Sequence, residues 1–455
     1  MKISAWLLCM SLPSCAALVA CSSSSPPATV TDAGTPDAPS ATCDKAPPAG
    51  YTQVVAPSKD ANVEVGSHTA MTLDKQGNPV IAYSVHDVTP TRPTESLYVV
   101  RWDPCAGAWT APLKIDNGFG YDDTLPSRNV AIATDESDGR IGIAYVKDYS
   151  IAMPNSTKAA FVSLSNDGGK TFSPGAKISV HGVETGKSSG DAEQINNPVI
   201  ALRGGKTFVA YNQEITACGP DRCQTGIVLA TGGATGAPFV RELMMDGLDA
   251  EFAGFARGSG FPLGLAVDSA NVPAIVAYVP PPTGYNMKVV FFRVGAVGTT
   301  IMDSKGVQND VGSASLVFDG MSPRALTRIN SGANPNGNLN FAASTDGKTW
   351  AAPLELPLDG ATDTPATQTL LADGKGGVVV LAQSKEEPGA ASGPKFWRSS
   401  NLTAFVIGGA GPRDSTPPTG KYMSGRLTST SKIRMAFFGD VPVVTSQGVV
   451  YWSEP

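Results

Sequence analysis

The sequence is poor in charge, in histidine and in helical patterns. Charged residues make up 16% of its 455 residues, against about a quarter in an average protein. Acidic residues outnumber basic ones by 40 to 34, which argues against the basic surface that nucleic-acid binding requires. Only three histidines are present, which argues against a multi-histidine metal site. No amphipathic helix of ten residues is predicted after position 50.

Turn-forming residues are abundant instead. The chain has 49 glycines and 36 prolines, roughly a fifth of its residues, and this composition favours many short strands joined by turns. Long apolar runs are also missing beyond the N-terminus, where residues 5–20 form an apolar stretch after Lys2. That stretch is too short for a comfortable membrane span and is typical of a secretory signal.

The apolar stretch ends in Leu18-Val19-Ala20-Cys21. This string resembles the lipobox of bacterial lipoproteins, whose cysteine is acylated and becomes the mature N-terminus. The resemblance implies a signal peptide over residues 1–20, lipidation at Cys21 and, because Ser22 follows, sorting to the outer membrane of a Gram-negative bacterium. Residues 21–48 hold few bulky apolar groups, so we expect a disordered Ser/Pro-rich tether before a folded domain over residues 49–455.

Four cysteines remain for the exported chain once Cys9, Cys15 and Cys21 are set aside. An even number in an exported protein predicts disulfides. Cys218 and Cys223 bracket a four-residue loop and are predicted to pair, which leaves Cys43 to pair with Cys105. No second ligand pair has zinc-site spacing, so no metal is expected here.

A repeat dominates the rest of the sequence. Four near copies occur, VIAY (80–83), GIAY (142–145), FVAY (208–211) and IVAY (275–278), and weaker copies follow as ALTR (325–328), VLAQ (380–383) and MAFF (435–438). Each is preceded by an apolar strand and a polar turn and is followed by a longer loop and a further strand. Seven units of four strands predict a seven-bladed β-propeller, with six blades as the alternative.

The strand composition agrees with this architecture. The repeat strands are apolar at successive positions, as in a sheet buried on both faces. The last unit has only three strands before the chain ends, so we expect residues 51–55 to supply the fourth strand by pairing beside residues 449–453. That pairing would close the ring.

Two turns resemble the Asp-box, S-x-D-x-G-x-T-W, of the sialidase-like (BNR-repeat) propellers. The matching residues are Ser165, Asp167, Gly169, Thr171 and Phe172 in the first turn, and Ser344, Asp346, Gly347, Thr349 and Trp350 in the second. We expect a structural role: the aspartate accepts backbone hydrogen bonds, the glycine takes a positive φ, and the aromatic ring packs between strands. The motif indicates the fold and is nearly silent on function.

The longer loops are predicted at 84–96, 147–158, 212–225, 279–287, 328–338 and 383–395, and in a propeller they share one face with the inter-blade segments. We call this the long-loop face and expect it to bind the ligand. The candidate ligand-binding residues are His86, Arg92, Asp191, Glu193, Arg222, Asp249, Glu251, Tyr285 and Arg328. Their many carboxylates would form an acidic funnel for a polyhydroxyl ligand, a basic peptide or a cation such as calcium; no other cofactor is expected.

Catalytic sialidases carry an F/Y-R-I-P motif and an arginine clamp, and this chain has no F/Y-R-I-P. The favoured function is therefore a non-enzymatic, monomeric binding module for a glycan or an envelope or extracellular protein, in contact with the membrane only through its lipid. The alternative is an exo-acting glycoside hydrolase, for which two carboxylates suffice. Its candidate catalytic residues are Asp87, Asp148 and Glu214.

Overall fold

The folded part of the chain consists of short antiparallel strands. In the computed structural model, residues Cys43–Pro455 form one compact unit. The structure describes residues 43–56, 58–60, 62–87, 94–118, 129–148, 158–179, 193–215, 225–233, 238–246, 263–279, 288–303, 314–331, 334–356, 368–385, 392–410, 421–441 and 444–455. Within these ranges every regular element is a strand, and no helix that could span a membrane occurs among them.

The strands group into seven sheets, which we number as blades in chain order. Blade 1 contains β2 (Val63–Leu73), β3 (Pro79–Asp87), β4 (Thr94–Asp103), β5 (Ala108–Trp109) and β6 (Leu113–Asn117). Blade 2 contains β7 (Val130–Thr134), β8 (Ile141–Asp148), β9 (Lys158–Ser165) and β10 (Ala176–Lys177). Blade 3 contains β11 (Glu193–Arg203), β12 (Lys206–Ile215), β13 (Thr225–Gly232) and β14 (Val240–Asp246). Blade 4 contains β15 (Leu263–Val267), β16 (Pro273–Val279), β17 (Lys288–Arg293) and β18 (Thr299–Asp303).

The remaining blades follow the same order. Blade 5 contains β19 (Ser315–Asp319), β20 (Ser322–Ser331), β21 (Asn334–Ala343) and β22 (Leu354–Leu356). Blade 6 contains β23 (Gln368–Ala372), β24 (Val378–Lys385), β25 (Ser392–Ser399) and β26 (Val406–Ala410). Blade 7 contains β27 (Lys421–Leu427), β28 (Ile433–Val441), β29 (Val444–Ser453) and, from the other end of the sequence, β1 (Gly50–Val55).

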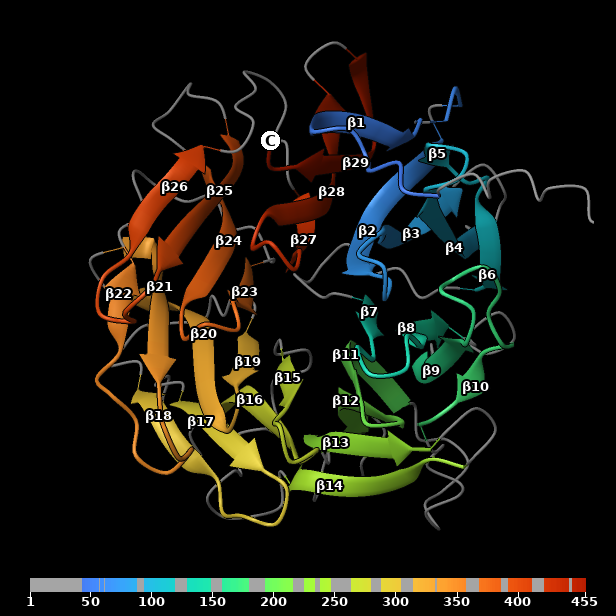
Figure 1. Ribbon diagram of the computed structural model, residues 1–455. Coiled ribbons are helices and arrows are strands. Elements are labelled where there is room, and N and C mark those ends of the chain that lie inside the picture. Colours follow the sequence, from blue (N-terminus) through green and yellow to red (C-terminus); the bar gives the residue numbers. More distant parts are fainter. Residues whose placement is uncertain are drawn as a thin grey trace, which may run out of the picture. The chain divides into compact units, whose positions relative to one another are not determined.

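The first strands of the blades form a closed inner ring. Each contacts the first strand of the next blade, in the order β2, β7, β11, β15, β19, β23, β27 and back to β2. Figure 1 shows the seven sheets arranged around this ring. The fold is a seven-bladed β-propeller, as the repeat predicts.

The ring is closed by the N-terminal strand. β1 pairs antiparallel with β29, and the register places Gly50 opposite Ser453 and Val55 opposite Val449. Figure 1 shows β1 beside β29, at the edge of the sheet that continues to β28 and β27. The predicted pairing of residues 51–55 with residues 449–453 is confirmed. Blade 7 therefore joins the two ends of the folded unit through one sheet.

The core lies between the blades. In β8, Ile143 and Tyr145 pack on blade 1, while Ala144 and Val146 pack on blade 3. Successive side chains of a strand point to opposite faces of its sheet, so both faces of this strand are covered. Such a strand must be apolar at every position, which explains the continuous apolar runs of the repeat.

Both Asp-boxes connect the third and fourth strands of their blades, as the sequence predicts. In blade 2, Oδ1 of Asp167 accepts hydrogen bonds from the Ser165 hydroxyl and the Thr171 amide, at 2.8 and 2.9 Å. Gly169 has a φ of +83°, which favours glycine. Phe172 packs against the cluster between blades 1 and 2. The turn thus fixes its own backbone and contributes one ring to an inter-blade core.

The second Asp-box repeats this geometry in blade 5. Oδ1 of Asp346 accepts hydrogen bonds from the amides of Lys348 and Thr349, each at 2.8 Å, and Gly347 has a φ of +75°. The ring of Trp350 packs edge-on against Phe291 of blade 4. These backbone hydrogen bonds hold the pKa of Asp346 below its usual range, because they stabilise the charged carboxylate.

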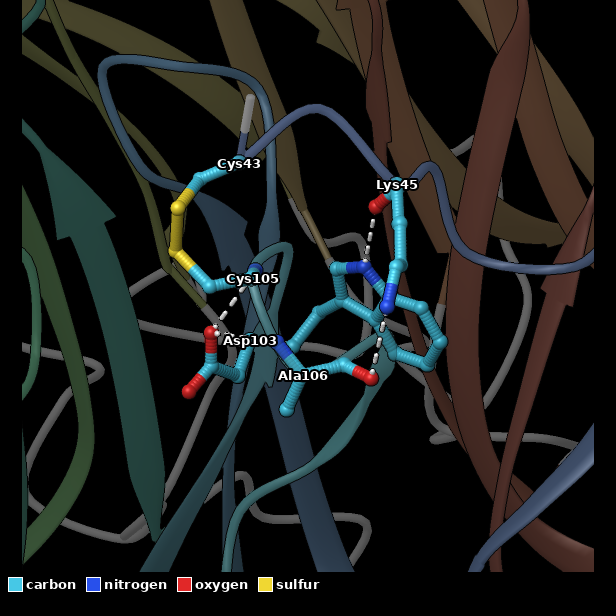
Figure 2. Close-up of a disulfide and its surroundings, with 6 residues drawn as sticks. Cys43, Lys45, Asp103, Cys105 and Ala106 are labelled. Carbon is cyan, nitrogen blue, oxygen red and sulfur yellow. Dashed lines mark hydrogen bonds between the residues drawn. A yellow bond between two sulfur atoms is a disulfide. The ribbon is translucent and has the colours of Figure 1, made fainter. Parts of the chain in front are cut away.

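A disulfide fastens the start of the compact unit to blade 1. Cys43 is bonded to Cys105, the pairing expected from the sequence, at the turn that follows β4. Figure 2 shows Lys45 beside this disulfide. The Lys45 carbonyl accepts a hydrogen bond of 2.6 Å from the Trp102 indole, and its amide donates to the Pro104 carbonyl at 3.2 Å. The segment before β1 is therefore held against blade 1, while β1 itself belongs to blade 7.

Candidate functional site

At the long-loop face the structure describes the ends of the strands. At this end of the ring each second strand connects to the third strand of its blade, and each fourth strand connects to the next blade. The connecting segments lie outside the described residues, and they include the candidates Arg92, Asp191, Arg222, Asp249, Glu251 and Tyr285. The predicted pair Cys218–Cys223 and the signal and tether residues 1–42, with Cys21, also lie outside them.

Blade 1 carries a row of ionisable residues at this end. The register places Glu64 of β2 opposite His86 of β3, and His86 opposite Glu95 of β4. Nδ1 of His86 lies 3.0 Å from Oε1 of Glu95. Both side chains are mostly buried, with 12% and 9% of their surface exposed. His86, a predicted ligand residue, is thus in contact with Glu95 of the neighbouring strand, a residue that the sequence analysis did not select.

A second charged group joins blades 1 and 2. Nζ of Lys147, in β8, lies 2.7 Å from Oδ1 of Asp116 in β6. The Tyr145 hydroxyl donates to Oδ2 of the same carboxylate at 2.6 Å. Asp116 was also missed by the sequence analysis, because only the folded ring brings the fourth strand of one blade beside the second strand of the next. The group ties two blades together just below their loops.

Uncharged amides lie in or beside the first two strands of the blades at the same end. The buried amide side chains here are Asn129, Asn196, Asn197, Asn212 and Gln368. Asn196 of β11 pairs in register with Asn212 of β12, so both side chains lie on one face of blade 3. Oδ1 of Asn196 is buried and has no hydrogen-bond partner among the described residues. A buried carbonyl oxygen without a donor is costly, so a ligand hydroxyl could stabilise it.

The backbone is irregular beside these amides. The pairing of β11 with β12 shifts between Asn196 and Val199, and Asn197 has a φ of +51°. Asparagine tolerates this left-handed conformation better than most residues. Similar register shifts occur in β2 and β27 near their long-loop ends. Such bulges often lie next to binding sites because they redirect side chains, and a positive φ at a non-glycine residue indicates strain that the fold must hold in place.

The predicted catalytic carboxylates lie on neighbouring second strands. Asp87 is the last residue of β3, Asp148 is the last residue of β8, and Glu214 is the penultimate residue of β12. The fold brings these three positions to the same end of blades 1, 2 and 3. Asp87 follows His86 directly, so the two side chains point to opposite faces of blade 1.

Arg328 lies within a strand that extends beyond its predicted end. β20 continues to Ser331, and Arg328 is only 4% exposed. Its amide donates to the Tyr278 hydroxyl at 2.8 Å, and its carbonyl accepts from the same hydroxyl at 2.7 Å. Burial raises the pKa of Tyr278 above its usual value. Glu193, the remaining candidate, is the first residue of β11.

A channel runs between the innermost strands. It has a volume of about 370 Å³, and all seven first strands contribute to its wall. The lining is mainly alanine, valine, isoleucine and leucine, and the charged residues in it are Glu136 and Arg426. Gly264 permits the close packing of this wall, because a Cβ atom there would lie 2.9 Å from the backbone nitrogen of Leu316. Among the described residues no group of three or more His, Cys, Asp or Glu side chains could hold a metal ion.

Comparisons with known proteins found similarity in structure. No family model matches the chain, and no curated protein matches it either. A protein of unknown function from Dyadobacter fermentans is similar with a TM-score of 0.45 and 13% identity, over 73% of this chain and 95% of that one. The NanB sialidase of Streptococcus pneumoniae gives a TM-score of 0.46 and 13% identity, over 89% of this chain and 70% of that one.

An α-L-arabinofuranosidase, Arb93A from Fusarium graminearum, is also similar. Its TM-score is 0.45 at 10% identity, over 89% of this chain and 97% of that one. Sialidases, the family that the two Asp-boxes resemble, are thus among the similar structures. The propeller fold itself rests on the strand pairing described above, and no activity is assigned from these similarities.

Proposed function

We propose that this protein is a surface-anchored lipoprotein whose propeller binds a glycan at its long-loop face. Lipidation at Cys21 would hold it at the outer membrane of a Gram-negative bacterium, as a monomer whose only membrane contact is the lipid. The chain enters the propeller at Cys43, which is bonded to Cys105 in a turn at the end opposite the long loops.

The observation that carries this proposal is the pair of amides in blade 3. Asn196 and Asn212 lie side by side at the long-loop end, and Oδ1 of Asn196 is buried without a partner among the described residues. Amides both donate and accept hydrogen bonds, which suits the hydroxyl groups of a sugar. A protein ligand would use the same face, but a carbohydrate matches neutral, paired amides more closely than a basic peptide does.

Binding to immobilised neutral and sialylated glycans tests the proposal. Asn196→Ala removes one hydrogen-bonding group and should weaken binding of a captured glycan roughly fivefold, since one hydrogen bond contributes on the order of 1 kcal/mol. Lys170→Ala, an exposed change in the Asp-box turn at the opposite end, is the matched control and should bind like the wild type. Equal loss in both variants, or capture of no glycan, would contradict the proposal.

The alternative function is glycoside hydrolysis, and the observation that favours it is the alignment of Asp87, Asp148 and Glu214 at the ends of neighbouring second strands. A general acid or base contributes about 10²–10⁴-fold to the rate. Turnover of aryl glycosides that falls by this factor in Asp87→Asn, Asp148→Asn or Glu214→Gln would establish an enzyme. We expect no release of sialic acid, because the chain lacks the F/Y-R-I-P motif.

The anchor has its own test. Cys21→Ser should abolish acylation, seen as loss of the lipid mass on the N-terminal peptide, and should release the protein from membranes. Retention of the unacylated variant in the membrane fraction would refute lipid anchoring, while leaving glycan binding to be decided separately.

A further inference from the structure

The disulfide between Cys43 and Cys105 lies in the wall of a groove at the end of the propeller opposite the long loops. The groove has a volume of about 510 Å³ and lies between turns of blades 1 and 2. Both cysteines line it, and both are exposed. Thiol–disulfide exchange requires access of a thiolate to one sulfur atom, and exposed bonds are the labile ones. The groove therefore gives a thiol access to this bond in the folded protein.

The charged side chains of this groove differ in how they are bonded. Each of its four carboxylates accepts a hydrogen bond from a backbone amide of its own turn, and they belong to Asp74, Asp103, Asp138 and Asp167. Two cations of the groove, Arg101 of β4 and Lys170 of the first Asp-box, have no side-chain hydrogen bond and no ion pair among the described residues. Their positive charges are therefore available to an anion that enters the groove.

These two cations act at the turn that carries Cys105. The amides of Ala106 and Cys105 and, more weakly, the charges of Arg101 and Lys170 hold the pKa of Asp103 below its usual range. Figure 2 shows the Asp103 carboxylate beside Cys105. In thiol–disulfide exchange the nucleophile and the leaving group are both thiolates, and nearby positive charges stabilise a thiolate. Positive charge at this turn should therefore accelerate exchange at the bond.

Contacts that involve no sulfur atom hold the two sides of the bond together. Lys45, two residues after Cys43, accepts a hydrogen bond of 2.6 Å from the Trp102 indole and donates through its amide to the Pro104 carbonyl at 3.2 Å. Its ammonium group also donates to the Ala106 carbonyl at 3.4 Å. The pairing of β1 with β29 holds the chain that follows. The two thiols would therefore remain neighbours after reduction, and the bond could form again without unfolding.

We infer that the Cys43–Cys105 bond is a site of reversible thiol–disulfide exchange, at which a dithiol in the groove reduces the bond while the propeller stays folded. One thiolate of the dithiol attacks a cysteine sulfur and forms a mixed disulfide with it, and the other cysteine leaves as a thiolate. The second thiolate of the dithiol then attacks the dithiol's own sulfur in the mixed disulfide, which releases the first cysteine. The dithiol leaves as a disulfide, the protein has gained the electron pair, and the cysteine thiolates take up the protons that the dithiol lost.

The exchange would change how the segment before β1 is attached to blade 1. In the oxidised protein the attachment is covalent, and in the reduced protein it depends on the hydrogen bonds of Lys45 alone. The inference goes beyond the proposed function and uses none of the residues on which glycan binding rests, so the two can fail independently.

Reduction of the folded protein without denaturant tests the inference. Dithiothreitol is added at several concentrations, the reaction is quenched with an alkylating reagent, and labelling of Cys43 and Cys105 is measured by mass spectrometry. The rate should rise in proportion to the dithiothreitol concentration and change little in dilute urea, while near-UV circular dichroism keeps its folded signal. Oxidised glutathione should then restore the bond. A rate that rises steeply with urea, as for a bond reached only by unfolding, or loss of the folded signal would overturn the inference.

Two matched lysine variants test the part that the groove plays. Lys170→Gln removes an exposed cation of the groove, whereas Lys348→Gln makes the same change before the threonine of the second Asp-box, in blade 5. Lys170→Gln should slow the exchange about twofold to fivefold, the effect of an exposed charge interaction, and Lys348→Gln should react like the wild type. The difference should shrink at high ionic strength, because salt screens exposed charges. Equal rates in the two variants at low ionic strength would overturn the role of the groove.

Discussion

Removing the disulfide between Cys43 and Cys105 should weaken the seam between blades 7 and 1. The bond closes a loop with a sequence separation of 62 residues. In the unfolded chain such a cross-link restricts conformational freedom, and the loop-entropy relation gives about 4 kcal/mol at 25 °C for this length. The double variant Cys43→Ser/Cys105→Ser is therefore expected to lose up to this amount, and the serines leave no reactive thiol behind.

The loss should also be local. Without the bond, the segment before β1 keeps the hydrogen bonds of Lys45 to Trp102, Pro104 and Ala106. Amide hydrogen exchange should therefore accelerate in β1 and β29 and stay unchanged in blade 4, on the far side of the ring. Denaturant unfolding monitored by fluorescence gives the overall loss. Equal stability of the two proteins, or faster exchange spread evenly over all blades, would refute the reasoning.

Three further outcomes are expected. Asp135 accepts hydrogen bonds from the Ser137 hydroxyl and from the amides of Gly205 and Ser137. Burial alone would raise the pKa of Asp135, but these bonds, together with the charge of Arg140, outweigh burial and lower it. The contribution of Asp135 to stability is therefore present above the ordinary aspartate range and is lost as the pH falls through the folded pKa. Asp135→Asn should accordingly flatten the decline in melting temperature between pH 5 and about pH 2, the range in which an aspartate titrates, and an unchanged slope would contradict this. Gly264→Ala should destabilise by about 1–3 kcal/mol in denaturant unfolding, because the added Cβ meets the backbone of Leu316; a neutral effect would show that β15 and β19 can separate. Asp167→Ala should cost on the order of 1 kcal/mol through lost turn hydrogen bonds and leave glycan binding unchanged, and a binding defect would show that the Asp-box does more than shape its turn.

The architecture was predictable from the sequence because the same physical requirement applies to the second strand of every blade. A second strand buried on both faces must be apolar throughout, and the number of such strands gives the number of blades. The aromatic positions are less regular than the sequence suggests. Tyr83, Tyr145 and Tyr211 pack on the preceding blade, whereas Tyr278 packs on the following one. The fourth copy is therefore displaced by one residue relative to its sheet, and a shift of one residue moves each side chain to the opposite face.

The site was less predictable because it depends on contacts between distant strands. The sequence analysis selected His86 by its position near a loop, but its partner Glu95 follows only from the register of β3 and β4. Arg426 was not selected, because the sequence of its inner strand gives no sign that this residue lines the channel. Only the closed ring brings its side chain to the Ile132 carbonyl of blade 2. The loops that carry most of the selected charged residues have no repeating sequence pattern. Those residues were therefore selected only because they are charged and lie in predicted loops.

The pairing of β1 with β29 also determines when folding can finish. Gly50 and Ser453 lie opposite each other, so nearly the whole folded unit must be synthesised before the first strand can find its partner. Until then β1 is an unpaired edge, and contacts between such distant residues form slowly. The bond from Cys43 to Cys105 can form once blade 1 is present, and it would keep β1 beside its final position while the other blades assemble. The oxidation that stabilises the finished ring therefore also shortens the search that completes it.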